Sequence, residues 1–182
     1  MKKGGLQIVQ TDHLTFLGIP LNGDKNTFGF QLEKEGYSFV SETDYVSIYE
    51  GRFANTDVSI LVGTTPLSGI VYSVFVQMEE KTWTSAKITY YRFKDLLSRK
   101  YGNIIEEVEQ FADPYYDGDG CEFSAISNGC CVYFTRFKAR NGEISLMINT
   151  NDEFDGVVLG YRDDKNGMLN DSEDDQIAFD DI

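Results

Sequence analysis

The chain passes twice through the same order of patterns, first a helical repeat of apolar residues and then several short segments in which apolar and polar residues alternate. A period near 3.6 residues predicts a helix with one buried face, and a period of two predicts a strand with one buried face. A chain of 182 residues that makes this change twice is restricted to an α+β architecture built from two comparable units.

Two helices are expected, over residues 24–35 and 82–100. In the first, Asp24 or Asn26 is placed to cap the N-terminus, and Gly36 stands where the helix should end. The second closes with basic residues, which suit the negative end of the helix dipole. The apolar side chains of the second helix recur every three or four positions and are Trp83, Ala86, Tyr90, Phe93 and Leu97.

Tight turns separate the expected strands. In the first half, residues 48–54, 58–62 and 70–76 predict a three-stranded meander. In the second half, Asn128-Gly129 and Asn141-Gly142 lie between alternating segments, and Asn-Gly is the strongest short-range hairpin signal. The strands expected there are residues 122–126, 130–139, 143–148 and 157–161.

The two halves also match in detail, because each carries an Arg-Phe pair in a strand that follows its helix, at Arg52-Phe53 and Arg136-Phe137. We therefore expect an α+β fold of two similar halves, each a helix plus about four antiparallel strands, with the helices on one face of the sheet. The alternative is a coincidence between two ordinary α+β segments. The expected units are residues 1–80 with an N-terminal lead-in, residues 81–162, and an acidic C-terminal tail of residues 163–182.

Turn and packing residues form a set that covers most of the chain. They are Gly18-Ile19-Pro20, Asn22-Gly23, Gly36-Tyr37, Trp83, Leu96-Leu97-Ser98-Arg99-Lys100-Tyr101-Gly102 and Asp180-Asp181-Ile182. This set resembles a family of uncharacterised proteins from Bacteroidetes-type bacteria. The plan is also similar to the beta-lactamase-inhibitor-protein-like fold, in which two such units form one sheet with helices on one side and an open face on the other. The resemblance implies this fold and carries no catalytic residue; family members often begin with a secretion signal, which this sequence lacks.

The second expected hairpin assigns side chains to the two faces of the sheet. If Arg140 lies opposite Glu143, then Phe137 pairs with Leu146. The core face then holds Tyr133, Thr135, Phe137, Ile144, Leu146 and Ile148, with Phe53, Val58 and Ile60 of the first half. The opposite face holds Val132, Phe134, Arg136, Lys138, Ser145, Met147 and Asn149, with Arg52, Ser59 and Leu61 of the first half.

This opposite face is the expected binding surface. Aromatic, methionine and arginine side chains are enriched at the centres of protein interfaces. The candidate residues for binding a protein partner are Arg52, Leu61, Phe134, Arg136 and Met147. The alternative is a plain solvated face, which antiparallel sheets often have.

The net charge of −14, from 30 acidic and 16 basic residues, argues against a nucleic-acid partner, because such a partner requires clustered Lys and Arg. Residues 163–182 hold eight of the acids and one base, so the rest of the chain is less acidic. No segment approaches the roughly 18 apolar residues of a membrane span, so none is expected.

The cysteines Cys121, Cys130 and Cys131 are expected to be three reduced thiols. Neighbouring strand residues point to opposite faces, and the expected hairpin places Ser127 opposite Cys130. Reduced thiols are typical of a reducing compartment. We therefore expect a cytoplasmic protein from the sequence as written, and a periplasmic or exported one if a natural leader is missing from it.

The chain offers little material for common catalytic chemistry. His13 is the single histidine of the chain. The sequence contains no nucleophile elbow, phosphate-binding loop or dinucleotide fingerprint, so no cofactor is expected. Carboxylates gather at Asp113, Asp117, Asp119 and Glu122. They indicate either a flexible acidic loop or the acids of a small hydrolase.

A weak calcium candidate lies near the end of the chain. Asp164, Asn166, Gly167 and Glu173 occupy the third, fifth, sixth and twelfth positions of a calcium-loop pattern, but Arg162 takes the first, where a carboxylate is needed. The alternative is a solvated tail. The apolar residues expected to dock this tail against the body are Ile177, Phe179 and Ile182.

These observations favour a non-enzymatic binding or inhibitory module that recognises another protein through the open sheet face. One alternative is a small carboxylate-dependent hydrolase that uses residues 113–122. Another is a small-molecule or peptide-binding protein with a cleft between the halves. An enclosed pocket with convergent polar groups would favour either alternative, whereas an open face favours a protein partner. The sequence assigns no oligomeric state.

Overall fold

The computed structural model describes residues 11–102 and 104–182, and most of its strands form one large antiparallel sheet. The elements of the first half are β1 (Thr15–Phe16), β2 (Ile19–Pro20), α1 (Lys25–Lys34), β3 (Ser38–Glu42), β4 (Val46–Phe53), β5 (Thr56–Thr64) and β6 (Val71–Glu79). Those that follow are α2 (Trp83–Tyr101), β7 (Ile104–Phe111), α3 (Glu122–Ser127), β8 (Cys131–Ala139), β9 (Gly142–Asn151), β10 (Phe154–Asp163) and α4 (Asp164–Asp180).

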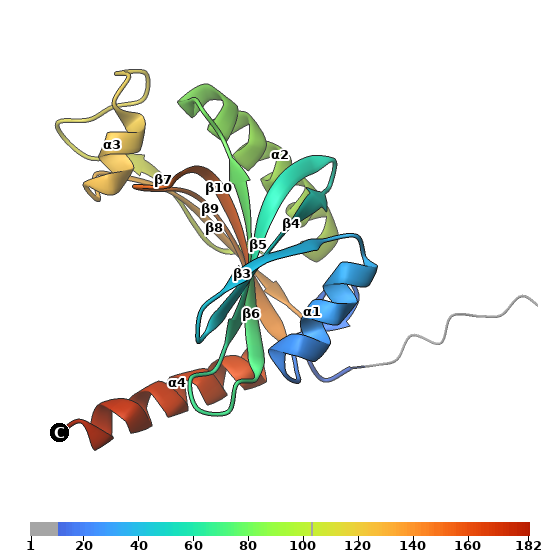
Figure 1. Ribbon diagram of the computed structural model, residues 1–182. Coiled ribbons are helices and arrows are strands. Elements are labelled where there is room, and N and C mark those ends of the chain that lie inside the picture. The colour runs from blue at the N-terminus through green and yellow to red at the C-terminus, as the bar shows by residue number, and fades with distance from the viewer. Residues whose placement is uncertain (1–10, 103) are drawn as a thin grey trace, which may run out of the picture.

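The sheet confirms the predicted plan of two similar halves. Its strand order is β3-β4-β5-β6-β10-β9-β8-β7, so each half contributes four adjacent strands (Figure 1). The last strands of the two halves, β6 and β10, pair antiparallel at the centre of the sheet. In each half, a helix is followed by the strand at the outer edge of the sheet. The next strands then lie progressively closer to the centre, where the last strands of the two halves pair.

The helices α1 and α2 lie where the sequence predicts them, to within one residue at each end. The side chain of Asp24 accepts hydrogen bonds from the backbone N–H groups of Asn26 and Thr27, which identifies it as the N-cap of α1. Thr82 caps α2 in the same way through Ser85 N–H. The five predicted apolar residues of α2 are all buried against the sheet, and Tyr90 hydrogen-bonds Thr135 of β8 at 2.6 Å.

The strand predicted over residues 122–126 is wrong, because this segment is the helix α3. The following Asn128-Gly129 ends that helix instead of joining two strands. Gly129 has a φ of 69°, and the N–H of Cys130 bonds to the carbonyl of Ala125. A positive φ serves both a helix end and a hairpin turn, so the dipeptide alone does not distinguish them. The predicted placement of Ser127 opposite Cys130 is also wrong, because it required residues 122–126 to form a strand.

The hairpin between β8 and β9 exists, but its register differs from the predicted one. Ala139 pairs with Gly142, and Phe137 pairs with Ile144 in place of Leu146. The predicted pairing of Arg140 with Glu143 is therefore wrong. A shift of two residues in the partner strand leaves every side chain on the same face, so the predicted core residues of both strands are buried.

The segment predicted as a tail forms the long helix α4, which leaves the body and carries the C-terminus outward (Figure 1). Asp163 caps its N-terminus through Asn166 N–H. Near its middle, the carboxylate of Glu173 accepts hydrogen bonds from the N–H groups of Leu67 and Ser68 in the β5–β6 loop. The prediction that the last residues dock is wrong for Phe179 and Ile182, whose exposed fractions are 76% and 103%.

Candidate binding surface on the open sheet face

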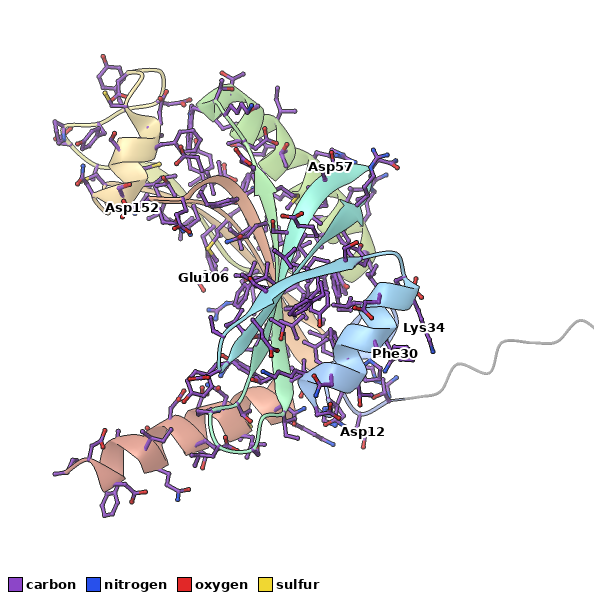
Figure 2. All side chains as sticks on the ribbon, in the orientation of Figure 1. Asp12, Phe30, Lys34, Asp57, Glu106 and Asp152 are labelled. Atoms are coloured by element: carbon purple, nitrogen blue, oxygen red, sulfur yellow. The ribbon has the colours of Figure 1, made fainter. Side chains whose placement is uncertain are left out.

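The sheet has one covered face and one open face. Its covered face packs against α1 and α2; for example, the rings of Trp83 on α2 and Tyr133 on β8 are 5.1 Å apart. Figure 2 shows Glu106 of β7 on the other side of the sheet from Phe30 and Lys34 of α1. Glu106 pairs across the strands with Arg136, so its position marks the open face.

Apolar side chains form a continuous band across the open face. Ile48, Leu61 and Phe75 are cross-strand partners on β4, β5 and β6. On the other half, neighbouring strands from β10 to β7 bring together Val158, Met147, Phe134 and Val108. The two rows are offset by one pleat and meet at the β6–β10 pair, where Phe75 lies opposite Gly160. We call these residues the apolar band: Ile48, Leu61, Phe75, Val158, Met147, Phe134 and Val108.

Gly160 joins the two rows of the band. A Cβ at this position would meet Ser145 Oγ at 2.5 Å and the ring of Phe75 at 3.1 Å. The lack of a side chain on Gly160 therefore lets the ring of Phe75 lie across β10. Phe75 remains 38% exposed, whereas Val158 beside it is 6% exposed.

Four cations of the open face are bound by acids of the same chain. Arg136 contacts Glu106 and also Glu143, the latter at 3.4 Å. Arg52 pairs with Asp57 at 3.3 Å. At the end of the face nearest α4, cations pair with helix acids, as Lys138–Asp164 at 3.0 Å and Arg162–Asp171 at 2.6 Å. The side chains in these pairs are 35–91% exposed, so each pair adds little to stability.

The first half of the open face is hollowed. A shallow depression of about 960 Å³ lies over β4, β5 and β6 and reaches the β9–β10 turn. Leu61 and Arg52 line it. Four acids line it against two bases: Glu50, Asp57, Glu79 and Glu153 against Arg52 and Lys81. The depression is therefore acidic as well as open.

The five residues predicted to bind a partner all lie on this open face, in two groups. Phe134 and Met147 are direct cross-strand partners, and Arg136 is one pleat away. Leu61 and Arg52 lie beyond the central strands, in the other half. The sequence reading missed the other members of the apolar band: Ile48, Phe75, Val108 and Val158. The strands carrying Ile48, Phe75 and Val158 were predicted, and only the pairing of the strands shows that their side chains join the band.

The carboxylates of the acidic loop serve the local structure. Asp117 accepts hydrogen bonds from Lys87 Nζ at 2.6 Å and Trp83 Nε1 at 2.7 Å, and these bonds lower the pKa of its carboxyl. Asp119 accepts one from Cys121 N–H, and the buried Glu122 accepts one from Gly118 N–H. Asp113 is exposed. The structure thus gives three of the four acids separate local partners.

The calcium candidates also do not converge. Asp164, Asn166 and Glu173 lie along one helix and bind different partners. Asp164 contacts Lys138, Asn166 donates to the carbonyl of Leu21, and Glu173 holds the β5–β6 loop. Within residues 11–102 and 104–182 there is no group of three or more His, Cys, Asp or Glu residues that could hold a metal ion.

The remaining reactive side chains of the sequence analysis are the imidazole of His13 and the thiols of the three cysteines. His13 Nδ1 lies 3.1 Å from a carboxylate oxygen of the buried Asp163. Burial raises the pKa of the Cys131 thiol to about 12, so it stays protonated; Cys130 is partly buried and Cys121 is exposed. In the part of the chain that the structure describes, no helix is both long and apolar enough to cross a membrane.

Comparison of the chain with models of known protein families, with curated proteins and with solved structures finds no match.

Proposed function

We propose that this protein is a binding module whose open sheet face takes a protein partner with a basic contact surface. The observation that carries the proposal is the apolar band, which crosses the sheet from β4 to β7 on the face opposite α1 and α2. Six of its seven side chains are partly or largely exposed, and an apolar row of this extent is characteristic of a surface that another molecule covers.

In this proposal, Phe134 and Met147 lie at the centre of the contact with the partner. They are cross-strand partners in the middle of the second half, and both are partly exposed. An aromatic ring beside a flexible thioether gives a surface that can be fully desolvated by a partner. Truncation of such central residues costs about 1 to 4 kcal/mol each in binding free energy.

The charge around the band favours a basic partner. Arg52, Arg136, Lys138 and Arg162 already contact acids of this chain. The depression beside the band has two more acids than bases, and the whole chain has a net charge of −14. A partner with lysines and arginines around an apolar ridge would complement this face and associate faster at low salt.

The proposed resemblance to the beta-lactamase-inhibitor-protein-like fold points the same way, since that fold leaves one face of its sheet open. The carboxylate-hydrolase alternative lacks comparable support, because the acids of the loop around Asp117 bind within the protein.

The test uses the full chain as bait in an extract of its native host. The wild-type protein is compared with a Phe134→Ser, Met147→Ser double variant and with Ile88→Ser, a control on α2 whose side chain is 65% exposed. A captured protein is identified, purified and titrated with all three baits at two salt concentrations. We expect a basic partner whose affinity falls roughly 100-fold or more in the double variant and stays the same in the control.

Circular dichroism must show that the double variant retains its fold. Equal affinity of the partner for the wild-type protein and the double variant would overturn the proposal. An acidic partner, or one lost in the Ile88→Ser control, would overturn it as well.

A further inference from the structure

The helix α4 leaves the body on the side of the sheet opposite α1 and α2, which is the side of the open face (Figure 1). Two of its acids contact cations of that face: Asp164 pairs with Lys138 at 3.0 Å, and Asp171 pairs with Arg162 at 2.6 Å. Asp175 lies one turn beyond Asp171 on the same side of the helix, because helical residues four apart share a face. We call Asp164, Asp171 and Asp175 the acidic side of α4.

Acids remain in excess where α4 meets the open face. Five acids and three bases lie around this contact: Glu106, Glu143, Asp164, Asp171 and Asp175, against Arg136, Lys138 and Arg162. Residues 171–182 hold six acids and no base. The C-terminal end of a helix is the negative end of its dipole, so acids there are unfavourable and cations from a partner would stabilise it.

The apolar band has the length of a helix. It crosses seven adjacent strands from β4 to β7, and six spacings of about 4.8 Å give roughly 29 Å. A helix of about 20 residues is about 30 Å long, and its apolar face repeats about every 5.4 Å, once per turn. On one face of an extended segment, side chains recur about every 6.8 Å. The strand spacing therefore matches a helix laid across the strands better than an extended segment.

The helix α4 begins beside the middle of the band. Gly160 joins the two rows of the band, and Asp163, the N-cap of α4, follows three residues later. This distance is about 10 Å, and a helix with its side chains has a radius of about 5–6 Å. Met168, on the same side of α4 as its acids, is 73% exposed and adds apolar surface. A helix lying on the band would therefore bring one flank within reach of α4.

We infer that the part of the partner held by the open face is a basic amphipathic helix. Its apolar side covers the apolar band, and lysines or arginines on one flank contact the acidic side of α4. This inference rests on the proposed function, because it specifies which element of the basic partner the open face binds.

The probe is a synthetic helical peptide of about 20 residues, with leucines on one face and lysines on both flanks. One control peptide has the same composition with Leu and Lys in alternation, which favours an extended strand. A second control is helical and has Glu in place of Lys. Binding to the full chain is followed by fluorescence anisotropy at two salt concentrations. We expect the basic helical peptide to bind below about 100 μM, at least about tenfold tighter than either control, and more weakly at high salt.

Charge reversal at two positions of α4 tests the contact with the helix flank. Asp175→Lys replaces an attraction with a repulsion and should weaken the basic helical peptide about tenfold. Asp180→Lys is the matched control, since it makes the same charge change at an exposed position about 140° away around the helix. It should change the affinity less than about twofold. The Phe134→Ser, Met147→Ser double variant should weaken the peptide at least about tenfold.

Circular dichroism checks that each variant keeps its fold. Equal weakening by Asp175→Lys and Asp180→Lys would mean that net charge alone attracts the peptide, and would overturn the inference. Binding of either control peptide as tight as that of the basic helix, or no binding of the basic helix, would overturn it too. If Asp175→Lys binds like the wild-type protein and the double variant does not, the inference fails and the proposed function stands. Unchanged affinity in the double variant counts against both.

Discussion

The two halves of the sheet share one plan but hold their outer strands differently. β7, the outer strand of the second half, is braced to α2 because Lys94 contacts both Glu107 and Glu109. β3, the outer strand of the first half, is exposed along its whole length, and Phe39 and Val40 are 49% and 48% exposed. Equal topology therefore does not require equal stabilisation, since two ion pairs join β7 to α2, whereas Lys25–Glu42 at 3.1 Å joins α1 to β3.

The halves also differ in the source of their aromatic packing. In the second half, Trp83 packs against Phe111, Phe123 and Tyr133, all within that half. In the first half, Phe53 stacks on Phe16 of the N-terminal lead-in, which in turn packs on Tyr161 of β10. The second half thus has a ring cluster of its own around Trp83, whereas Phe53 of the first half stacks both on Phe16 and on Phe93 of α2.

The largest effect is expected from Trp83→Ala. The side chain is 9% exposed and contacts three other rings, so its removal should lower the free energy of unfolding by about 3–5 kcal/mol. Phe39→Ala, on the exposed strand of the other half, should cost less than about 1 kcal/mol. Urea denaturation measures both values, and similar losses would contradict the difference between the halves.

A smaller effect is expected from Asp163→Asn, at the junction between the N-terminal lead-in, β10 and α4. The carboxylate accepts bonds from Leu14 N–H at 2.7 Å and Asn166 N–H at 2.9 Å, and the amide would turn a donor toward one of them. The loss should be about 2 kcal/mol. Hydrogen exchange should show faster exchange at Leu14 and in the first turn of α4; unchanged protection there would show that Asp163 does not hold the junction.

The smallest effect is expected from Asp117→Asn, in the dependence of the free energy of unfolding on pH at acidic pH. The hydrogen bonds from Lys87 and Trp83 lower the pKa of Asp117 in the folded protein, so they stabilise the fold above the ordinary carboxyl value near 4. This contribution is lost as the pH falls through the lowered pKa. Asp117→Asn should therefore lose stability at neutral pH and show a shallower decline below about pH 4. Parallel curves for the variant and the wild-type protein would assign the acid dependence to other groups.

The sequence predicts much of the fold where local signals are strong. The cap Asp24 placed α1 and the apolar repeat of residues 82–100 placed α2, and alternation placed side chains on the correct face even where the β8–β9 register was wrong. Period two is insensitive to a shift of two residues, which explains why the faces of the five candidate residues could be predicted.

Other elements could not be predicted because their signals are ambiguous or weak. β3 and β7 are exposed edge strands, so they lack a buried row that would reveal alternation. α4 is anchored by polar residues, Asn166 and Glu173, and not by an apolar stripe. The apolar band contains residues that are far apart in the sequence, such as Phe75 and Val158. The pairing of β6 with β10 brings them together, so the band can be recognised only in the folded sheet.

The most direct measurement of the central claim is an NMR map of the protein with its captured partner bound. Binding through the open face predicts that the largest signal changes fall on Phe134, Met147 and Phe75, on both halves of the sheet. The exposed surface of α2 around Ile88 should remain unchanged. Changes confined to α1 and α2, with the apolar band unaffected, would contradict the claim.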